Sequence, residues 1–551
     1  MINSTLQEQL NNLLNCDLKE LYPVARSLNR KLCFHVGPTN SGKTYKAMEE
    51  LKSADCGTYL APLRLLALEN YETLKEQNVP VSLVTGEEEK FDEDAGHICS
   101  TIEMIDFNLD VDVCVIDEVQ MLADPDRGWA WVNAIVGSPA RKVIMTGSVN
   151  ALDAVKKIAT YLGEDLEIVK FQRKNPLEVM KKAVNLRDIE SGTALIAFSR
   201  AEVLKIKSKL SKYHKVSVLY GNLSPEVRQD EARRFRSGET DILVATDAIA
   251  MGLNLPIKYI LFTTDEKYDG ISQRKLISNE ITQIAGRAGR YGHHEQGYVG
   301  ATSKKVLEHI AVEFKAPLRT IKPPFIVKAT GVQIEELSTH LKTKNLTQIL
   351  NYFSKHMKFD GPFKAVNLSS MIELSKDLDT KHDMKLEDKY LLSQAPISLK
   401  SPLIRSAYYF YINSIINQNT VHYKCSVNIH KVARTQQDLL RAEDEVKKIS
   451  LYLWIAYKFP TLFPDAQKAT NSRVEVNQYC ENTLKSRKIS FERKETPHHN
   501  RNSKRDNYKR KDGERAPRRG RNNSASTKTN THNKDEDTNS RSGSRNRRKR
   551  Y

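Results

Sequence analysis

Short apolar segments alternate with longer amphipathic segments over most of this chain, and this alternation limits the possible fold more than any other feature. Nearly every residue within an apolar segment is hydrophobic, as in strands that are buried on both faces of a parallel sheet. The alternation occurs in two series, so we expect an α/β protein with two parallel sheets. The expected strands are 32–36, 58–60, 81–84, 98–100, 113–116 and 143–145 in the first series, and 194–198, 216–219, 242–245, 259–262 and 297–301 in the second.

Changes of pattern along the chain predict its division into parts. Leucines at helical spacing indicate one amphipathic helix near the N-terminus. The segment Arg173 to Pro176 is a suitable joint between the two α/β domains, because proline interrupts helices. After Pro317 we expect no further strands. We expect helices there instead, at 341–357, 401–418 and 436–457. The expected parts are a helix in 1–30, α/β domains at 31–172 and 173–317, a mainly α-helical module at 318–484, and a tail at 485–551.

The segment Gly37-Pro-Thr-Asn-Ser-Gly42-Lys43-Thr44 matches the phosphate-binding pattern G-x-x-x-x-G-K-[ST] and lies between an expected strand and an expected helix. Glycines allow the backbone N–H groups to surround phosphates, and the start of the helix adds positive potential. The alternative, a turn with a surface lysine, does not explain the strand–loop–helix context. The residues expected to bind ATP here are Gly37, Thr39, Asn40, Ser41, Gly42, Lys43 and Thr44.

An apolar segment that ends in Asp117 and Glu118 follows in the same α/β domain. We expect Asp117 to hold Mg²⁺ together with the hydroxyl of Thr44, and Glu118 to activate the attacking water. Acidic residues end many strands, so this interpretation depends on the phosphate-binding loop that precedes it.

Arginines follow Gln283 in the sequence Gln283-Ile-Ala-Gly-Arg287-Ala-Gly-Arg290. On a helix, Arg287 and Arg290 would share one face and could reach a γ-phosphate on the neighbouring domain, as arginine fingers do. Taken alone, solvated arginines at a helix end are the better interpretation. Together with the phosphate-binding loop, the pattern favours catalytic roles for Gln283, Arg287 and Arg290.

In combination, these elements resemble a superfamily 2 helicase with two RecA-like domains. Further short motifs occur in the order of that superfamily, and the resemblance implies roles for their residues. Thr146, Gly147 and Ser148 would couple hydrolysis to strand movement, and Gly252 would contact the nucleotide. The residues that would contact RNA are Pro62, Arg64, Thr85, Gly86, Thr101, Ser199, Arg200, Gly221 and Thr246.

A narrower resemblance rests on GPTNSGKTYKA, APLRLLALE, IDEVQM, QIAGRAGR and the late segment LYLWIAYKFPTLFPD. These segments resemble the ATP-dependent RNA helicase family of the mitochondrial RNA degradosome and its bacterial relatives, from about residue 31 to 470. The resemblance implies ATP- and Mg²⁺-dependent unwinding of RNA duplexes with 3′ to 5′ polarity, in RNA turnover, with an exoribonuclease partner. An RNA-binding remodeller that does not separate strands, or a DNA helicase or translocase, would carry the same motifs.

The net charge of +18 is concentrated in the tail. Residues 485–551 contain 23 Lys and Arg and eight Asp and Glu, a net charge of +15, whereas the 484 residues before them have +3. A segment with so few aliphatic side chains cannot bury a core, so we expect disorder. It either tethers RNA without sequence preference or only aids solubility, and the concentrated charge favours the tether.

The remaining composition excludes other classes. No apolar run reaches the roughly 20 residues that span a bilayer, so we expect no membrane partner. Seven cysteines are scattered without a metal-binding spacing, which is typical of reduced thiols. The N-terminus resembles neither a signal peptide nor an Arg-rich transit peptide, because Glu8, Asp17 and Glu20 precede the first arginine. These observations predict a cytoplasmic protein.

Overall fold

The first parallel sheet carries the phosphate-binding loop. In the computed structural model of the chain, it has the order β5-β4-β6-β3-β7-β8-β2-β9, and only β5 is antiparallel to its neighbour. Its strands are β2 (Lys31–Val36), β3 (Gly57–Ala61), β4 (Val81–Val84), β5 (Glu89–Lys90), β6 (His97–Thr101), β7 (Val111–Ile116), β8 (Ala140–Gly147) and β9 (Leu166–Lys170). The structure describes residues 14–251, 254–290, 294–381, 384–397, 401–429 and 432–486.

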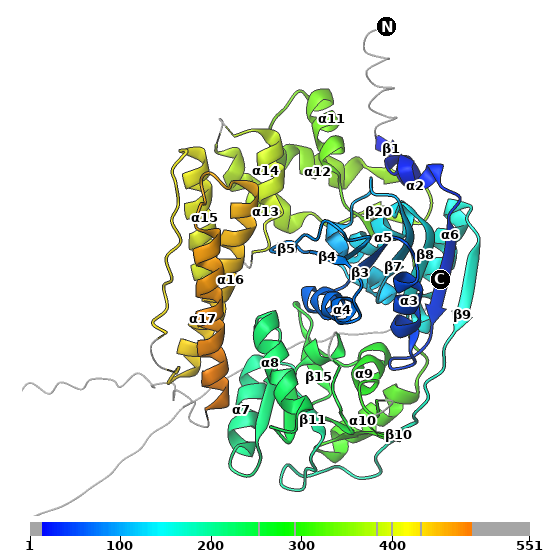
Figure 1. Cartoon of the computed structure of the whole chain (residues 1–551), viewed down its shortest axis with the longest axis vertical. Helices are drawn as coiled ribbons and strands as arrows, with labels where there is room; N and C mark the ends of the chain where they lie inside the picture. The colour runs from blue at the N-terminus through cyan, green and yellow to red at the C-terminus, as the bar shows by residue number, and fades with distance from the viewer. Residues whose placement is uncertain are drawn as a thin grey trace, which may run out of the picture. The chain divides into compact units, whose positions relative to one another are not determined.

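Both faces of this sheet are covered, which explains the continuous apolar strands. In β2, Phe34 and Val36 enter one core while Cys33 enters the core on the opposite face, as the two-residue period of a strand requires. The covering helices are α3 (Lys43–Lys52), α4 (Arg64–Glu76), α5 (Gly128–Gly137) and α6 (Leu152–Leu162) (Figure 1). Hydrophobic burial on two faces therefore holds the loop after β2 at the sheet's carboxyl edge.

The second sheet is also parallel, with the order β10-β17-β14-β11-β13-β12. Its strands are β10 (Leu177–Val179), β11 (Thr193–Ile196), β12 (Val216–Leu219), β13 (Ile242–Ala245), β14 (Tyr259–Phe262) and β17 (Gly297–Ala301). Its helices are α7 (Arg200–Leu210), α8 (Pro225–Arg236), α9 (Ser278–Ala285) and α10 (Lys304–Lys315), and a hairpin of β15 (Glu266–Tyr268) and β16 (Gln273–Lys275) precedes α9. The expectation of two parallel-sheet domains of the RecA-like kind is confirmed.

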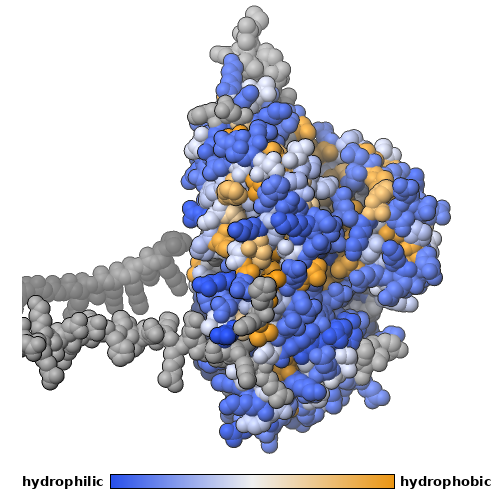
Figure 2. Space-filling model, turned by 60° about the vertical axis from the view of Figure 1, so that its left-hand side comes forward, coloured by the Kyte–Doolittle hydropathy of each residue, from blue (hydrophilic) through white to orange (hydrophobic). Residues whose placement is uncertain are grey.

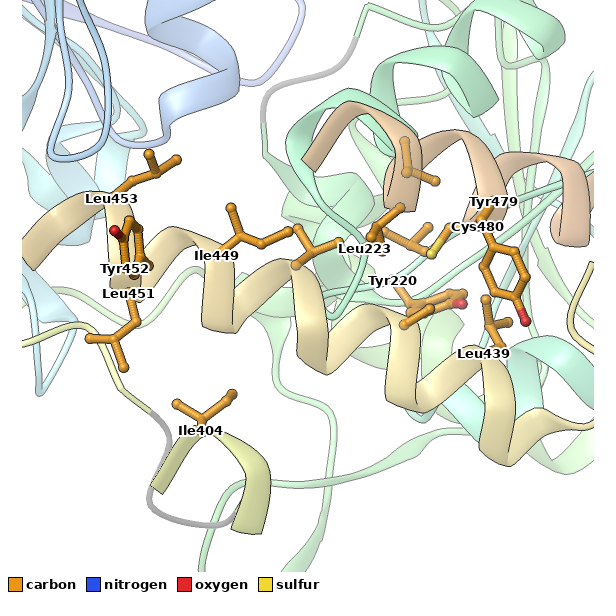
Figure 3. Close-up of a cluster of buried hydrophobic side chains, with 14 of the residues drawn as sticks. Tyr220, Leu223, Ile404, Leu439, Ile449, Leu451, Tyr452, Leu453, Tyr479 and Cys480 are labelled. Carbon is orange, nitrogen blue, oxygen red and sulfur yellow. The ribbon is translucent and has the colours of Figure 1, made fainter. Parts of the chain in front are cut away.

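A mainly helical region follows, as expected. It contains α11 (Gly331–Leu341), α12 (Leu346–His356), α13 (Ser369–Asp379), α14 (Leu386–Ser393), α15 (Pro402–Ile416), α16 (Gln436–Lys458) and α17 (Ala466–Lys485). Figure 3 shows α16 and α17 in one apolar cluster with Tyr220 and Leu223 of the second sheet domain. The side of the molecule with α15 to α17 comes forward in Figure 2, where hydrophilic residues predominate around smaller apolar groups.

Several details differ from the predictions. The helix expected at 341–357 is shorter and corresponds to α12, because α11 ends at Leu341, Lys342 takes a left-handed conformation, and Asn345 caps the start of α12. Strands do occur after Pro317: β18 (Phe325–Val327), β19 (Lys358–Phe359) and β20 (Phe363–Ala365). They are short and pair only with distant segments, β19 with β1 (Asn15–Cys16) and β18 with β20, so their sequences carry no repeating pattern.

The N-terminal prediction is also wrong over the residues that can be compared. Residues 14–30 form β1, a 3₁₀ turn η1 (Leu18–Leu21) and the short helix α2 (Pro23–Ser27) instead of one helix. Pro23 is at the first position of α2, where its missing N–H costs nothing. Leu18 is nonetheless fully buried in the core of the first sheet domain. The expected disordered tail lies almost entirely at 487–551, outside the described residues.

No helix among the described segments has the length and apolar character that crossing a bilayer requires.

Candidate nucleotide site

The loop between β2 and α3 forms one wall of a cavity of about 250 Å³. Gly42, at the start of α3, has φ +87°, a left-handed conformation that favours glycine. Lys43 points back along the loop, and its Nζ donates to the carbonyl of Pro38 over 2.6 Å. Burial lowers the pKa of Lys43. The loop residues that line the cavity are Gly37, Thr39, Asn40, Ser41, Gly42, Lys43 and Thr44.

The carboxylate of Asp117, at the end of β7, is the acceptor at the centre of a hydrogen-bond network. Thr44 donates to its Oδ1 over 3.0 Å, Tyr59 donates to its Oδ2 over 2.9 Å, and the hydroxyl of Thr146 donates to Oδ1. The side chain is buried. Asp117 and Thr44 therefore present two oxygens, one anionic, at the point where the loop meets the sheet.

Glu118 follows in an unusual backbone conformation. Its φ of +54° is left-handed, which costs a residue with a side chain about 1 kcal/mol or more. Its carboxylate accepts a hydrogen bond from Gln120, whose Oε1 in turn accepts from the backbone N–H of Ser148 over 3.1 Å. Burial and the neighbouring Asp117 raise the pKa of Glu118. Gln120 thus links Glu118 to the segment expected to couple hydrolysis to movement.

Arginines from the second sheet domain complete the cavity. Arg287 Nη2 lies 3.8 Å from Glu118 Oε1, and Arg287 Nε donates to the Ala250 carbonyl over 3.0 Å. Arg290 lines the same cavity, and burial together with Arg287 lowers its pKa to about 10. Cations from one domain therefore face the phosphate-binding loop and acidic pair of the other.

The route by which these arginines reach the cavity differs from the prediction. They do not share a helix face, because α9 ends at Ala285 and the chain turns at Gly286. A Cβ on Gly286 would lie 2.7 Å from Thr39 Cβ, so the close approach of the two domains requires glycine there. Gln283, two residues before the end of α9, does not line this cavity. It lines a second one instead.

The second cavity, of about 520 Å³, lies on the second sheet domain. Predicted RNA contacts gather there, together with Gln283: Ser199, Arg200, Gly221 and Thr246. Arg200, however, is already paired. Its Nε lies 2.8 Å from a carboxylate oxygen of Glu443 on α16, and Glu443 is 2% exposed.

The predicted RNA contacts of the first domain are not gathered in one cavity. Arg64 pairs with Glu87 at 3.0 Å, Glu88 at 2.8 Å and Glu226 at 3.2 Å. Thr85 is buried, and its hydroxyl donates a hydrogen bond to the Glu88 carbonyl over 3.0 Å. The other predicted contacts occupy loops or strand ends: Pro62, Gly86 and Thr101.

The remaining predicted residues divide clearly. Thr146 and Ser148 line the nucleotide cavity, whereas Gly147 is buried beside Gln120 and Phe34. Gly252 lies outside the described residues. Sequence reasoning missed Gln120, Tyr59 and Glu69, which also line the cavity. Gln120 and Glu69 were present in the quoted IDEVQM and APLRLLALE segments, whereas Tyr59 was placed only in an expected strand.

A phosphate-binding loop, a strand-end acidic pair and arginines from a second parallel sheet together define a two-domain nucleotide-dependent motor of the helicase kind. Comparison with protein families gives three matches: the DEXQ-box helicase domain of Suv3 at residues 19–171, the helicase conserved C-terminal domain at 177–292, and the ATP-dependent RNA helicase SUV3 C-terminal domain at 439–486. Asp117-Glu118-Val-Gln120 is the DEXQ sequence.

Individual proteins give the same result. The mitochondrial ATP-dependent RNA helicase SUV3 of Saccharomyces cerevisiae is 34% identical over 486 residues, covering 84% of this chain and 65% of the relative. That of Candida albicans is 33% identical, covering 86% and 70%. The mitochondrial DExH-box ATP-dependent RNA helicase DExH16 of Arabidopsis thaliana is 33% identical, covering 85% and 83%. The chain belongs to the SUV3 family of superfamily 2 ATP-dependent RNA helicases.

The chain spans slightly less than two thirds of the length of the yeast SUV3 proteins that it matches. Among solved structures, S. cerevisiae Dbp5 bound to RNA and ADP BeF3 is similar with a TM-score of 0.39 and 15% identity, covering 66% of this chain and 94% of that one.

The expectation of a cytoplasmic protein is contradicted, because the names of the SUV3 relatives place them in mitochondria. The expectation rested on the composition of the first residues and on scattered thiols, and the thiols indicate only a reducing compartment.

Proposed function

We propose that this chain hydrolyses ATP and uses the energy to separate RNA duplexes. The observation that carries the proposal is the approach of Arg287, from the second sheet domain, to Glu118 at the end of β7, at 3.8 Å across a cavity lined by the phosphate-binding loop. A nucleotide held there would draw the domains together, and hydrolysis would remove the charge that bridges them. Each cycle would alternate closed and open arrangements.

Within the cavity, each group has a distinct proposed role. The backbone N–H groups from Gly37 to Thr44 and the Lys43 ammonium bind the phosphates. Glu118 accepts a proton from the attacking water and is oriented by Gln120. Arg287 and Arg290 stabilise the charge that develops on the γ-phosphate. Gln283 remains a proposed participant only if domain movement brings it from the second cavity.

Mg²⁺ fits the residues present. The Thr44 hydroxyl and the Asp117 carboxylate lie 3.0 Å apart, and hydroxyl and carboxylate oxygens are the ligands that Mg²⁺ prefers. When bound, the ion would neutralise charge on the β- and γ-phosphates. The hydrogen bonds from Tyr59 and Thr146 keep the Asp117 carboxylate oriented toward Thr44.

For RNA, we propose contacts with the sugar–phosphate backbone from residues of both domains, in a path that includes the second cavity. Arg64 and Arg200 would contribute only if RNA phosphates replace the carboxylates that now surround them. The proposed domain limits remain 31–172 and 173–317, with the helical module at 318–484. As in the named relatives, we propose a mitochondrial location.

The decisive experiment is strand displacement with RNA and DNA duplexes that carry either a 3′ or a 5′ overhang. The proposal expects ATP-dependent displacement of RNA from a 3′ overhang, hence 3′ to 5′ movement. ATP hydrolysis stimulated by RNA without displacement would indicate a remodeller, and greater stimulation by DNA would indicate a DNA translocase. The Lys43→Ala variant serves as the control for ATP dependence.

A role in RNA turnover also requires an enzyme that degrades the released strand. We propose that an exoribonuclease begins at the single-stranded 3′ overhang and continues into the paired part of the strand as 3′ to 5′ unwinding makes that part single-stranded. Addition of a purified 3′ exoribonuclease should remove the overhang in every case but degrade the paired part of the strand only when ATP and this helicase are both present. Degradation at an equal rate without ATP would contradict the proposal.

A further inference from the structure

Arg173 lies in the segment that joins β9 of the first sheet to β10 of the second. Its guanidinium has five N–H donors in a planar fork, and all five are engaged. All the acceptors are backbone carbonyls. Nε donates to Asn175 over 2.7 Å, and Nη1 donates to Thr39 over 3.2 Å and to Gly286 over 2.7 Å. Nη2 donates to Gly289 over 3.1 Å and also to Ala288.

This set of partners is unusual, because all five acceptors are neutral carbonyls and none is a carboxylate. Burial lowers the pKa of Arg173 to about 10, so the side chain remains charged at neutral pH. The carbonyls of Gly286, Ala288 and Gly289 follow the C-terminal end of α9, where the helix dipole is negative. A cation is favourable at that position, and its fixed fork can accept the geometry of several carbonyls at once.

The carbonyls belong to two functional segments. Thr39 is part of the phosphate-binding loop of the first domain, and Gly286 to Gly289 is the turn that carries Arg287. The two segments also touch directly, since Asn40 Nδ2 donates to the Gly286 carbonyl over 2.9 Å. Arg173 therefore ties the turn to the loop, although it does not itself line the cavity.

We infer that Arg173 is a positioning residue for ATP hydrolysis: it keeps the turn of Arg287 against the phosphate-binding loop, so that Arg287 reaches Glu118. The inference rests on the proposed function. Arg173 moves with the second domain through four of its five bonds, because Asn175, Gly286, Ala288 and Gly289 all belong to that side. Only the bond to Thr39 crosses to the first domain and breaks when the domains separate.

The test compares Arg173→Ala and Arg173→Lys with Arg187→Ala, which removes an exposed arginine from the same region. Lysine keeps the charge but offers three donors from one atom, so it cannot span these carbonyls. We expect both Arg173 variants to lose kcat by about 10- to 100-fold, the cost of a misplaced catalytic group. KM for ATP should remain close to that of the wild type, whereas the melting temperature should fall because five hydrogen bonds are lost, so kcat is compared well below it. Wild-type kcat in Arg173→Lys would overturn the inference.

A second measurement does not depend on turnover. Hydrogen exchange of the backbone amides at 284–290, with a non-hydrolysable ATP analogue bound, should be faster in both Arg173 variants than in the wild type and Arg187→Ala. Unchanged exchange at these amides would overturn the inference even if the wild type hydrolysed ATP. Conversely, faster exchange in a protein whose wild type shows no ATP turnover would support the positioning role and reject the proposed function.

Discussion

Arg287 and Glu118 face each other across the nucleotide cavity at 3.8 Å, although they belong to different parallel sheets. Burial lowers the pKa of the arginine and raises that of the glutamate, so each needs the other's charge or a bound phosphate. In the nucleotide-bound state, the γ-phosphate would replace the carboxylate as the partner of Arg287. Such an exchange of partners would make the arrangement of the two domains depend on whether ATP is bound.

Substitution of Glu118 by Gln should abolish turnover while leaving binding intact. The amide keeps the shape of the side chain but cannot accept a proton from water, so we expect kcat to fall by about 10²- to 10⁴-fold. Lys43→Ala should lose both turnover and nucleotide affinity, because its ammonium reaches the phosphates. Phosphate release and binding of a fluorescent ATP analogue measure the two effects. Full turnover in either variant would mean that the site is wrongly assigned.

ATP affinity should depend on pH through Glu69, which lines the cavity on α4. Burial raises its pKa to about 7, against the opposing effect of Arg236 and Arg290. Below that pH the side chain is neutral, and above it the carboxylate repels the phosphates. We expect KM for ATP to rise a few-fold more between pH 6 and 8 in the wild type than in Glu69→Gln, an effect on the order of 1 kcal/mol.

Two comparisons isolate this effect. The nucleotide's own titration is common to both proteins and cancels in their ratio. The variant Glu76→Gln removes an exposed carboxylate seven residues later on α4, and it should retain the wild-type pH dependence. Parallel pH profiles of the wild type and Glu69→Gln would contradict the assignment.

Much of the fold and the centre of the site follow from the sequence, because both depend on local patterns. Continuous apolar strands and the loop from Gly37 to Thr44 need no knowledge of distant segments. The strands after Pro317 escaped prediction because they are two or three residues long and pair with segments far away in sequence. Arg173 escaped for the same reason, since four of its five acceptors lie more than 100 residues away along the chain.

Arg200 shows that a motif does not determine the partner of a charged residue. Its pattern predicts an RNA contact, yet in the structure it neutralises buried Glu443, which also accepts a hydrogen bond from Tyr220 over 2.7 Å. A short motif gives the type of residue at a position, but it does not show which residue pairs with it in the folded protein. The same holds for Arg64 among its three glutamates.

Loss of Arg200 should therefore destabilise the contact between the second sheet domain and α16. Arg200→Ala leaves the Glu443 carboxylate buried without its cation, which typically costs about 3–5 kcal/mol. The double variant Arg200→Met with Glu443→Leu removes both charges and should recover most of that loss. Urea unfolding measures the effect. An unchanged unfolding midpoint in Arg200→Ala, combined with weaker RNA binding, would instead assign Arg200 to RNA.

Removal of residues 487–551 should weaken RNA binding and reduce its dependence on salt. The deleted segment carries 22 Lys and Arg and eight Asp and Glu. RNA releases bound counterions in proportion to the number of its phosphates that Lys and Arg neutralise, so a charged tail makes binding depend on salt. Truncation after Ser486 retains α17, whose end is held by Lys207 donating to the Leu484 carbonyl. RNA affinity measured between low and moderate salt should show a shallower slope, while ATP hydrolysis without RNA stays at the wild-type rate.

A tail of the same length made of Gly and Ser should behave like the truncation, because charge is the property being tested. Unchanged affinity at low salt would reject the tether and leave solubility as the role of the tail.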